Sequence, residues 1–324
     1  MMKKTILLSN NYKGLPRRIL EEAVGDRFHL ALLSRPDQEE LYERVSGADY
    51  LLVSGRLKVD EELIRRAKKL KMVQRTGVGL DNIDLACLKK YGIPLYVNRG
   101  VNAVSVAEHT LMLMLSTIRN SYRVNCLMRQ GIWKKQETGL TTHELSGKCI
   151  GLVGLGSIGR LVVKMLSGFD VRILYYDQVR LGPDQEESLG VIYRDFPDIL
   201  KEVDILSLHC ALDPSGTYLI SDKEFDRMKE GAVLINTARG RLVEEEALIR
   251  ALDSGRLSAC GIDTFETEPP AGTSRLAAYK QALLSPHIAG VSYEAFSRMM
   301  GQAIGNITAF DEGDLASIEG SRRL

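Results

Sequence analysis

A glycine-rich turn between two short apolar runs constrains this chain more than any other feature. Residues 149–153 read Cys-Ile-Gly-Leu-Val, and residues 154–159 read Gly-Leu-Gly-Ser-Ile-Gly. Apolar residues then repeat at helical spacing over residues 161–166, and a second β-rich run ends at Asp177. Continuous apolar runs are typical of buried parallel strands. This stretch therefore predicts a strand, helix, strand unit with a glycine turn at its first junction.

The glycines of this turn suit the binding of a dinucleotide. Gly154 allows a tight turn, Gly156 lets a pyrophosphate approach the backbone, and Gly159 lets helix and strand pack closely. Asp177 follows Gly159 by 18 residues, where an acid can accept hydrogen bonds from ribose hydroxyls. Its charge would repel a 2′-phosphate, so we expect NAD rather than NADP. The alternative is a chance glycine turn in an ordinary α/β protein, and the complete unit favours dinucleotide binding.

The length and charge of the chain limit the classes of protein that remain. A chain of 324 residues predicts about two domains with sizeable cores. The net charge is +1, which gives no electrostatic reason to expect nucleic acid or an anionic membrane as a partner. The five cysteines are scattered and contain no CxxC pair. We therefore expect reduced thiols in the cytoplasm and no metal site, and the N-terminus does not read as a signal peptide.

Two blocks of alternating strands and helices predict a doubly wound α/β fold. In residues 5–97 five β-rich runs alternate with four helical patterns. The expected strands there are Thr5–Leu8, Phe28–Leu33, Tyr50–Val53, Met72–Arg75 and Pro94–Val97. A long helical pattern runs from Ala103 to about Ile118, and a polar arm containing Trp133 leads to the glycine unit. Both blocks then predict parallel sheets, with a ligand cleft between them.

The strands expected after the glycine unit complete an open sheet. They are 205–208, 232–236, 257–263 and 282–285, with a helix at about 244–252. A last helix is expected from Ser292 to about Glu312, followed by a loose tail from Ala316 to Leu324.

Three charged or titratable residues follow strands of the second sheet. Arg239, Glu268 and His287 each come shortly after an apolar run, and strand ends on one edge of a parallel sheet converge. Such a set suits reduction of a 2-oxo acid. Arg239 would bind the carboxylate and polarise the carbonyl, and His287 would deliver a proton. Glu268 would hold the imidazole and favour its protonated form.

Each of these residues also has a structural interpretation. Arg239 could form a surface ion pair, Glu268 could be a solvated loop acid, and His287 could be a satisfied, partly buried histidine. We interpret the remaining histidines as structural, solvated or packing residues; they are His29, His109, His143 and His209.

Six motifs in the chain resemble the D-isomer-specific 2-hydroxyacid dehydrogenase family. They occur in family order between about Arg75 and Gly290. The matching segments are Arg75 to Asp84, Asn102 to His109, Glu144 to Lys148 with the glycine motif, Asn236 to Gly240, Asp263 to Pro269, and Ser285 to Gly290. The first 50 residues match only in pattern.

The resemblance implies roles for particular residues. It implies Arg239, Glu268 and His287 as the catalytic set. It implies that the substrate contacts Ser54, Val78, Gly79, Arg239 and His287. The cofactor-binding residues that it implies are Gly154, Gly156, Ser157, Ile158, Gly159, Asp177, Cys210, Thr237, Arg239, Asp263, His287 and Gly290.

The resemblance also implies the domain organisation and the partners. A flavodoxin-like substrate domain would comprise residues 1–98 and 293–324, because the last helix returns to it, and a Rossmann-type NAD domain would comprise residues 99–292. The partners would be a small 2-oxo or 2-hydroxy acid and a second copy of the chain, since the family commonly dimerises through the region near 103–145.

Departures from the family leave the substrate open. Ser54 stands where the 3-phosphoglycerate enzymes carry a phosphate-binding arginine, although Arg56 could substitute, and Ala211 replaces a frequent proline. The expected form is the short one, without a C-terminal regulatory domain. Candidate substrates are 3-phosphoglycerate, glyoxylate or hydroxypyruvate, and lactate-like acids. Glu268 disfavours the formate dehydrogenase branch, which has glutamine there. A different class, an NAD(H)-sensing binding protein on the same fold, stays as the alternative.

Overall fold

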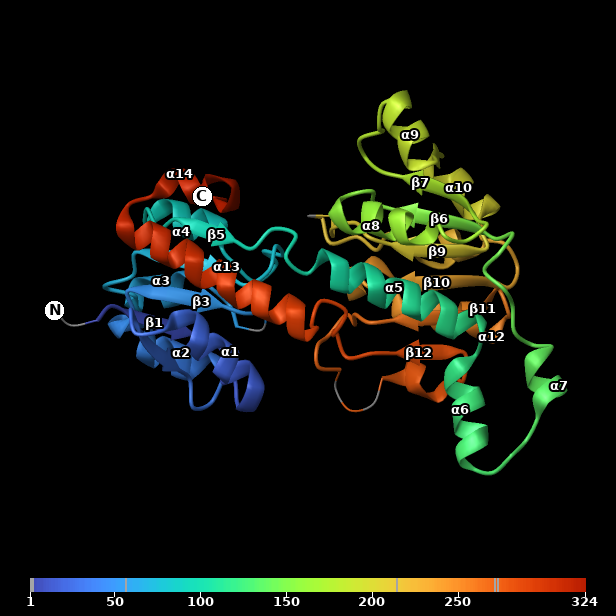
Figure 1. Cartoon of the computed structure of the whole chain (residues 1–324), viewed down its shortest axis with the longest axis horizontal. Coiled ribbons are helices and arrows are strands. Elements are labelled where there is room, and N and C mark those ends of the chain that lie inside the picture. Colours follow the sequence, from blue (N-terminus) through green and yellow to red (C-terminus); the bar gives the residue numbers. More distant parts are fainter. Residues whose placement is uncertain (1–2, 56, 214, 271, 273) are drawn as a thin grey trace. The chain divides into compact units, whose positions relative to one another are not determined.

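The computed structural model describes residues 3–55, 57–213, 215–270, 272 and 274–324. The chain divides into two compact units. Unit 1 comprises Met1–Asn102 and Tyr293–Leu324, and unit 2 comprises Ala103–Ser292. Each unit is a parallel sheet with helices on both faces (Figure 1). The predicted fold class, α/β with two doubly wound parallel sheets, is therefore confirmed.

Unit 1 has a five-stranded sheet with the order β2-β1-β3-β4-β5, the flavodoxin-like order. Its strands are β1 (Thr5–Leu8), β2 (His29–Leu32), β3 (Tyr50–Val53), β4 (Met72–Arg75) and β5 (Leu95–Val97). Its helices are α1 (Gly14–Val24), α2 (Gln38–Arg44), α3 (Glu61–Arg66), α4 (Leu85–Lys90), α13 (Tyr293–Glu312) and α14 (Leu315–Ile318).

Alternation along each strand builds two cores in unit 1. Leu7, Leu51 and Val73 face α2, α3 and α4, whereas Leu8 and Leu52 face α1, α13 and α14. Successive side chains of a strand point to opposite faces, so a strand covered on both faces must be apolar throughout. This explains why the strands of this unit are continuous apolar runs.

Unit 2 has a seven-stranded sheet with the order β12-β11-β10-β9-β6-β7-β8. Its strands are β6 (Cys149–Val153), β7 (Arg172–Tyr176), β8 (Val191–Tyr193), β9 (Ile205–Leu208), β10 (Ala232–Asn236), β11 (Leu257–Ile262) and β12 (Ala282–Leu284). Its helices are α5 (Ala103–Ile118), α6 (Ser121–Arg129), α7 (Lys135–Gly139), α8 (Ser157–Leu166), α9 (Pro183–Leu189), α10 (Phe196–Glu202), α11 (Asp222–Phe225) and α12 (Glu245–Asp253).

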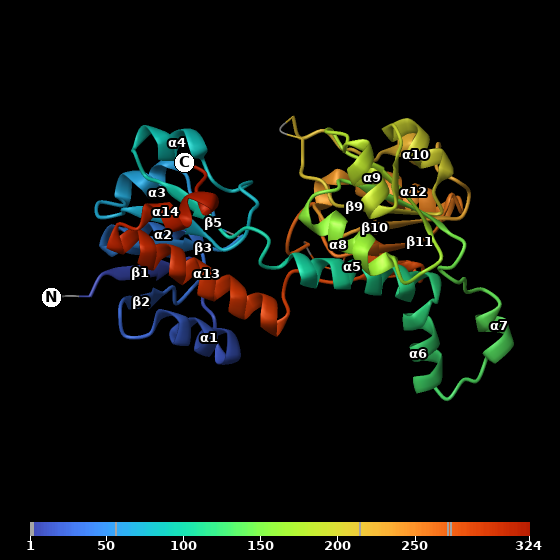
Figure 2. The same ribbon diagram turned by 45° about the horizontal axis from the view of Figure 1, so that its top comes forward.

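The strand order of unit 2 reverses direction between β6 and β9. The chain builds outward from β6 through β7 to β8, and then returns to the other side of β6 at β9. Ligands of open α/β sheets bind beyond the carboxyl ends of the strands at such a point. Helices α5 and α8 cover one face of this sheet, and α10, α11 and α12 cover the other (Figure 2).

Several elements were not predicted from the sequence. Strand β8 has only three residues, and α6 and α9 bury none of theirs in this structure. The prediction of a loose tail at residues 316–324 is wrong. Helix α14 occupies its start, Ile318 is buried, and the Arg323 N–H donates to the Leu95 carbonyl at 2.8 Å. Of the helices in the described ranges, none has the length and apolar character needed to cross a membrane.

A buried polar cluster joins the returning helix α13 to the sheet of unit 1. Asn306 donates from Nδ2 to Oε1 of Gln74 at 3.1 Å, and Gln74 donates from Nε2 to Oδ1 of Asn98 at 3.0 Å. Asn98 in turn donates to the Met299 carbonyl at 2.7 Å. These amides are almost fully buried, so each needs its partner.

Replacing Asn306 by leucine should destabilise unit 1, because Gln74 Oε1 would lose its donor inside the core. A buried acceptor left without a partner costs about 1–3 kcal/mol. Urea unfolding of Asn306→Leu should show a loss of this size. Glu294→Gln, an exposed change on the same helix, should alter the free energy of unfolding by less than about 0.5 kcal/mol. Equal stability of the two variants would contradict this account of the cluster.

Candidate active site and cofactor site

The glycine turn lies between β6 and α8, at the point where the strand order of unit 2 reverses. Gly154 has a φ of 96°, and a Cβ there would lie 2.7 Å from the His209 carbonyl carbon. A Cβ on Gly159 would lie 2.4 Å from the Gly154 oxygen. By contrast, a Cβ on Gly156 would meet nothing within 4 Å. Packing therefore requires the first and third glycines, while the second leaves an open approach to the backbone.

This turn fits a dinucleotide. Ser157 and Ile158 begin α8, a helix of 10 residues, and Gly156 at its N-cap contributes no side-chain hydrogen bond. The first N–H groups of a helix have no partner within the helix and attract phosphate. Here they lie beside the residue that leaves space for it. The residues present therefore suit a pyrophosphate.

Asp177 lies just past β7 and is tied to the glycine turn. Its Oδ2 accepts a hydrogen bond from the Leu155 N–H at 2.7 Å. Cys210 follows β9 on the same rim, and burial, with a contribution from the charge of Asp177, raises the pKa of its thiol to about 11. The thiol is thus protonated at neutral pH. Both predicted cofactor-binding residues belong to the rim that carries the glycine turn.

The turn after β10 carries Arg239 and is braced by Asn236. The Asn236 side chain accepts from the Ala238 N–H at 3.0 Å and donates to the Arg239 carbonyl at 2.9 Å. The Thr237 hydroxyl lies 3.0 Å from that of Thr110 on α5. The backbone beneath the Arg239 side chain is therefore fixed by bonds on both sides.

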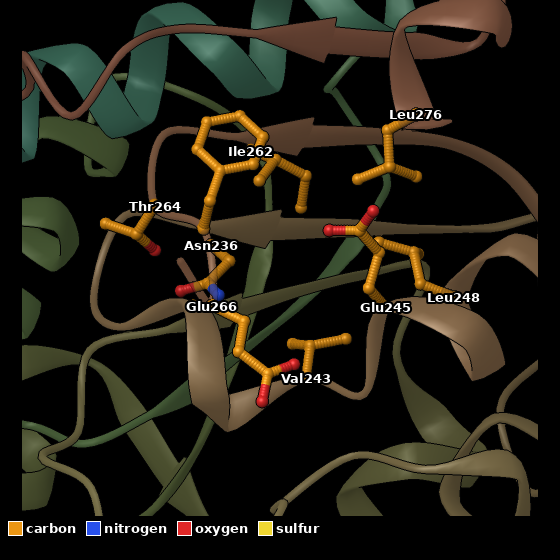
Figure 3. Close-up of a pocket in the computed structure, with 10 residues that line it drawn as sticks. Asn236, Val243, Glu245, Leu248, Ile262, Thr264, Glu266 and Leu276 are labelled. Atoms are coloured by element: carbon orange, nitrogen blue, oxygen red, sulfur yellow. The ribbon is translucent and has the colours of Figure 1, made fainter. Parts of the chain in front are cut away.

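Gly240 brings this turn against the loop that follows β11. A Cβ at this position would lie 2.0 Å from the Phe265 carbonyl carbon and 2.4 Å from the Glu266 nitrogen. Only glycine permits this approach, so the loops of Arg239 and Glu268 are in direct backbone contact. A cavity of about 20 Å³ lies behind them, next to Thr264 (Figure 3). That volume suits about one water molecule.

Glu268 and His287 form a hydrogen-bonded pair. His287 Nδ1 lies 2.5 Å from Glu268 Oε2, and Glu268 Oε1 accepts from the Phe265 N–H at 2.9 Å. Burial opposes ionisation of the carboxyl, but the bonds from His287 and Phe265 and the positive charges of His287 and Arg239 outweigh it. They hold the pKa of Glu268 below its ordinary value, so the group is a carboxylate at neutral pH. The structure thus brings Arg239, Glu268 and His287 together.

The backbone of His287 is left-handed, with a φ of 53°. This conformation costs an ordinary residue roughly 1–2 kcal/mol, so it requires support from its surroundings. The His287 N–H donates to the Asp263 carbonyl at 2.7 Å. Asp263 is fully buried, and its carboxylate accepts hydrogen bonds from the N–H groups of Ile288 and Ala289. Gly290 lies in the turn just after this loop.

The predicted substrate residues of unit 1 lie at the ends of its strands. Ser54 follows β3, is buried, and donates from its N–H to Ser9 Oγ at 2.9 Å. Val78 is 49% exposed, and the Gly79 carbonyl accepts from Arg75 Nε at 2.9 Å. Arg56, the suggested substitute for a phosphate-binding arginine, lies outside the described residues.

His209 and His109, which the sequence did not assign to the site, have different surroundings in the structure. His209 Nε2 lies 2.9 Å from Ser207 Oγ, and burial lowers the pKa of His209 to about 4. It is therefore neutral at pH 7. His109, interpreted from the sequence as structural or solvated, lies 2.9 Å from Ser285 Oγ in the loop of His287. Its position in the Asn102 to His109 motif, between the buried residues Ala107 and Thr110 of α5, is the sequence feature that could have indicated a structural contact.

Comparison with known proteins defines the class. The model of the D-isomer specific 2-hydroxyacid dehydrogenase NAD-binding domain matches residues 111–289. The glyoxylate reductase of Thermococcus litoralis is 37% identical over 285 residues, covering 86% of this chain and 86% of that protein. The hydroxypyruvate reductase of Thermotoga maritima is 37% identical over 265 residues, covering 81% and 85%. A solved glyoxylate reductase from Paecilomyes thermophila has a TM-score of 0.82 at 30% identity, covering 95% of both chains.

The chain therefore belongs to the D-isomer specific 2-hydroxyacid dehydrogenase family. It is an NAD-dependent oxidoreductase of that class. The family, the class of enzyme and the cofactor predicted from the sequence are confirmed.

We expect Asp177 to set the choice between NADH and NADPH, because a carboxylate at the end of β7, beside the glycine turn, would repel a 2′-phosphate. We expect a clear preference for NADH, relaxed in Asp177→Ala and in Asp177→Asn, which keeps an acceptor for the Leu155 N–H. The measurement is kcat/KM with each cofactor. Asp170→Asn, at an exposed position, should keep the original preference. Equal use of both cofactors by the unmodified enzyme would refute the assignment.

Proposed function

We propose that this enzyme reduces small 2-oxo acids of the glyoxylate and hydroxypyruvate type to the D-2-hydroxy acids. The observation that carries the proposal is the His287–Glu268 pair, with an Nδ1 to Oε2 distance of 2.5 Å, beside the Arg239 turn of the NAD-binding unit. NADH supplies the hydride when it is bound.

The three side chains have complementary roles in this proposal. Arg239 presents a planar guanidinium, which can hold the substrate carboxylate through two hydrogen bonds and polarise the neighbouring carbonyl. Because His287 Nδ1 is bound to Glu268, proton transfer falls to Nε2. A protonated ring held in this way can give its Nε2 proton to the developing alkoxide. In the direction of oxidation the neutral ring would take this proton back.

The relatives and one residue of unit 1 support small substrates. Two of the compared proteins are named glyoxylate reductases and one a hydroxypyruvate reductase. By the family resemblance, Ser54 stands where the 3-phosphoglycerate enzymes carry an arginine for the phosphate, with Arg56 two residues away as the alternative. The exposed Val78 and the neighbouring Gly79 are proposed contacts for the substrate carboxylate.

An NADH oxidation screen tests the proposal. The panel comprises glyoxylate, hydroxypyruvate, pyruvate and 3-phosphohydroxypyruvate, each tested over a range of concentrations. The largest kcat/KM should be obtained with glyoxylate or hydroxypyruvate. A larger value with pyruvate or the phosphorylated acid would replace the proposed substrate class. Tight NADH binding without turnover of any acid would favour the NAD(H)-sensing alternative.

Replacing Arg239 by lysine should weaken the binding and turnover of the substrate but not the binding of the cofactor. Lysine keeps the positive charge but loses the planar fork. We expect kcat/KM for glyoxylate to fall by about 10²-fold in Arg239→Lys, because loss of oriented binding in the transition state has effects of this order. NADH affinity, measured by fluorescence titration, should change little. Arg241→Lys, two residues away and about half-exposed, is the matched control and should keep nearly full activity.

Replacing Glu268 by glutamine should narrow the pH range of reduction. The pKa of Glu268 lies below its ordinary value, so the carboxylate is charged throughout the neutral range and loses its charge only as the pH falls through that lowered value. Glutamine removes the charge at every pH. In Glu268→Gln the alkaline decline of kcat/KM for reduction should therefore begin at lower pH than in the unmodified enzyme.

The control for this profile is Glu266→Gln. Glu266 lies in the same loop as Glu268, and its carboxylate accepts a hydrogen bond from the Tyr218 hydroxyl. Its alkaline limb should match that of the unmodified enzyme. If Glu268→Gln also leaves that limb in place, the carboxylate does not influence the acid, and the proposed role of the pair is wrong.

We also propose that the chain forms a homodimer through the region of α5, α6 and α7. Helices α6 and α7 extend away from the sheet of unit 2 (Figures 1 and 2). Their segment exposes large apolar side chains, including Trp133 at 76% and Leu140 at 86%. A groove of about 710 Å³ lies beside it. Light scattering during size-exclusion chromatography should give the mass of two chains.

The five free thiols support a cytoplasmic location.

A further inference from the structure

The buried carboxylate of Asp263 lies at the centre of a hydrogen-bond network that the catalytic set does not include. Oδ1 accepts from Ser285 Oγ at 2.5 Å and from the Ile288 N–H at 3.0 Å. Oδ2 accepts from the Ala289 N–H at 2.9 Å. Asp263 has no exposed surface, so its charge is stabilised by these donors rather than by water. The donors all come from the loop that contains His287.

His109 extends this network to helix α5. Its Nε2 lies 2.9 Å from Ser285 Oγ and 3.6 Å from Asp263 Oδ1. The serine hydroxyl has one proton, which it gives to the carboxylate. Its oxygen must therefore accept from His109, and this requires a proton on Nε2 of His109. The order of donation is then imidazole to hydroxyl to carboxylate.

A second residue of α5 holds the other end of the same loop. Ser105 Oγ donates to the Ala289 carbonyl at 2.7 Å. Ser105 and His109 are four residues apart and so lie on one face of the helix. Together they fix the loop at Ser285 and at Ala289, on either side of His287. The left-handed backbone of His287 is thus held between two contacts from one rigid element.

We propose that His109 and Ser285 are positioning residues for proton transfer. They complete the hydrogen bonds of Asp263 and so fix the loop that directs the His287 imidazole toward Glu268. The inference rests on the proposed role of His287 in the reaction. His109 itself does not transfer a proton, because its Nε2 is bound to Ser285 and its side chain is 13% exposed. The contrasting view is that His109 only packs between helix and sheet.

Three substitutions of His109 separate these views. The amide of glutamine can place an N–H near the position of Nε2, whereas the shorter asparagine places it near Nδ1, and leucine offers no donor. If His109 positions the loop, His109→Asn and His109→Leu should lower kcat for the best 2-oxo acid by about tenfold or more, since small misplacements of a reacting group have large effects. KM should change by less than about twofold.

Rescue by glutamine is the decisive comparison. His109→Gln should keep kcat within about threefold of the unmodified enzyme, a difference well under 1 kcal/mol. Ser285→Ala removes the bridging hydroxyl without touching α5 and should reproduce the effect of leucine. It also keeps the test valid if His109→Leu does not fold. Unchanged kcat in His109→Leu and Ser285→Ala, or an equal loss in all four variants, would overturn the inference.

A second measurement does not depend on turnover. Amide hydrogen exchange of a peptide covering residues 285–292 should be faster in His109→Leu than in the unmodified enzyme and in His109→Gln, because Ile288 and Ala289 donate to Asp263. A peptide from β6 should be unchanged, and His29→Gln, at an exposed site in unit 1, should match the unmodified enzyme in both peptides.

The two measurements distinguish failure of this inference from failure of the proposed function. If the unmodified enzyme reduces none of the acids but exchange in residues 285–292 responds as expected, the positioning network is supported and the proposed reaction is wrong. If the enzyme is active and exchange in this loop is the same in all His109 variants, the positioning role is wrong.

Discussion

The hydrogen bonds to the buried carboxylate of Asp263 are the interaction on which the candidate active-site edge of unit 2 depends. A carboxylate without exposed surface is tolerated only when hydrogen-bond donors surround it. Here the donors are the Ser285 hydroxyl and two backbone N–H groups of the following loop. The need to satisfy this charge fixes the path of the chain after β12. That path places His287, with its left-handed backbone, where it meets Glu268.

Helix α5 is the element that makes this arrangement rigid. A Cβ on Gly261 would lie 3.1 Å from Leu113 Cβ, so the glycine allows α5 to approach β11 closely. From this position the polar side chains of α5 reach two different strand ends. Thr110 contacts Thr237 beside the Arg239 turn, and His109 contacts Ser285 after β12. Helix α5 thus contacts both the turn of Arg239 and the loop of His287. Gly240 brings the Arg239 turn into direct backbone contact with the loop of Glu268.

Much of this could be predicted from the sequence, and the physical reasons for the exceptions are clear. The bounds of strands Tyr50–Val53 and Cys149–Val153 were predicted correctly from continuous apolar runs, because both faces of these strands are buried. The pairing of Glu268 with His287 followed from the convergence of strand ends. The contact of His109 with Ser285 joins residues 176 positions apart, and no local pattern indicates the partner. Helix α6 buries no residue, so its apolar side chains take no part in the core pattern from which the other helices were predicted.

The residues of the candidate site fall into two groups by exposure: the His287–Glu268 pair is open to solvent, and the residues that hold its loops are buried. The His287 and Glu268 side chains are 47% and 35% exposed, and an ion pair so open to solvent contributes little to folding. Their close contact therefore fits the proposed proton transfer better than a contribution to stability. Asp263, Thr237 and Thr110 are buried and form bonds that cannot exchange easily with water. A solvent-accessible acid that is held from behind by a buried network can exchange protons with water while its position stays fixed. Hydride transfer from a nicotinamide needs no protein acid, whereas delivery of the matching proton needs an acid that is both held in position and able to recover its proton.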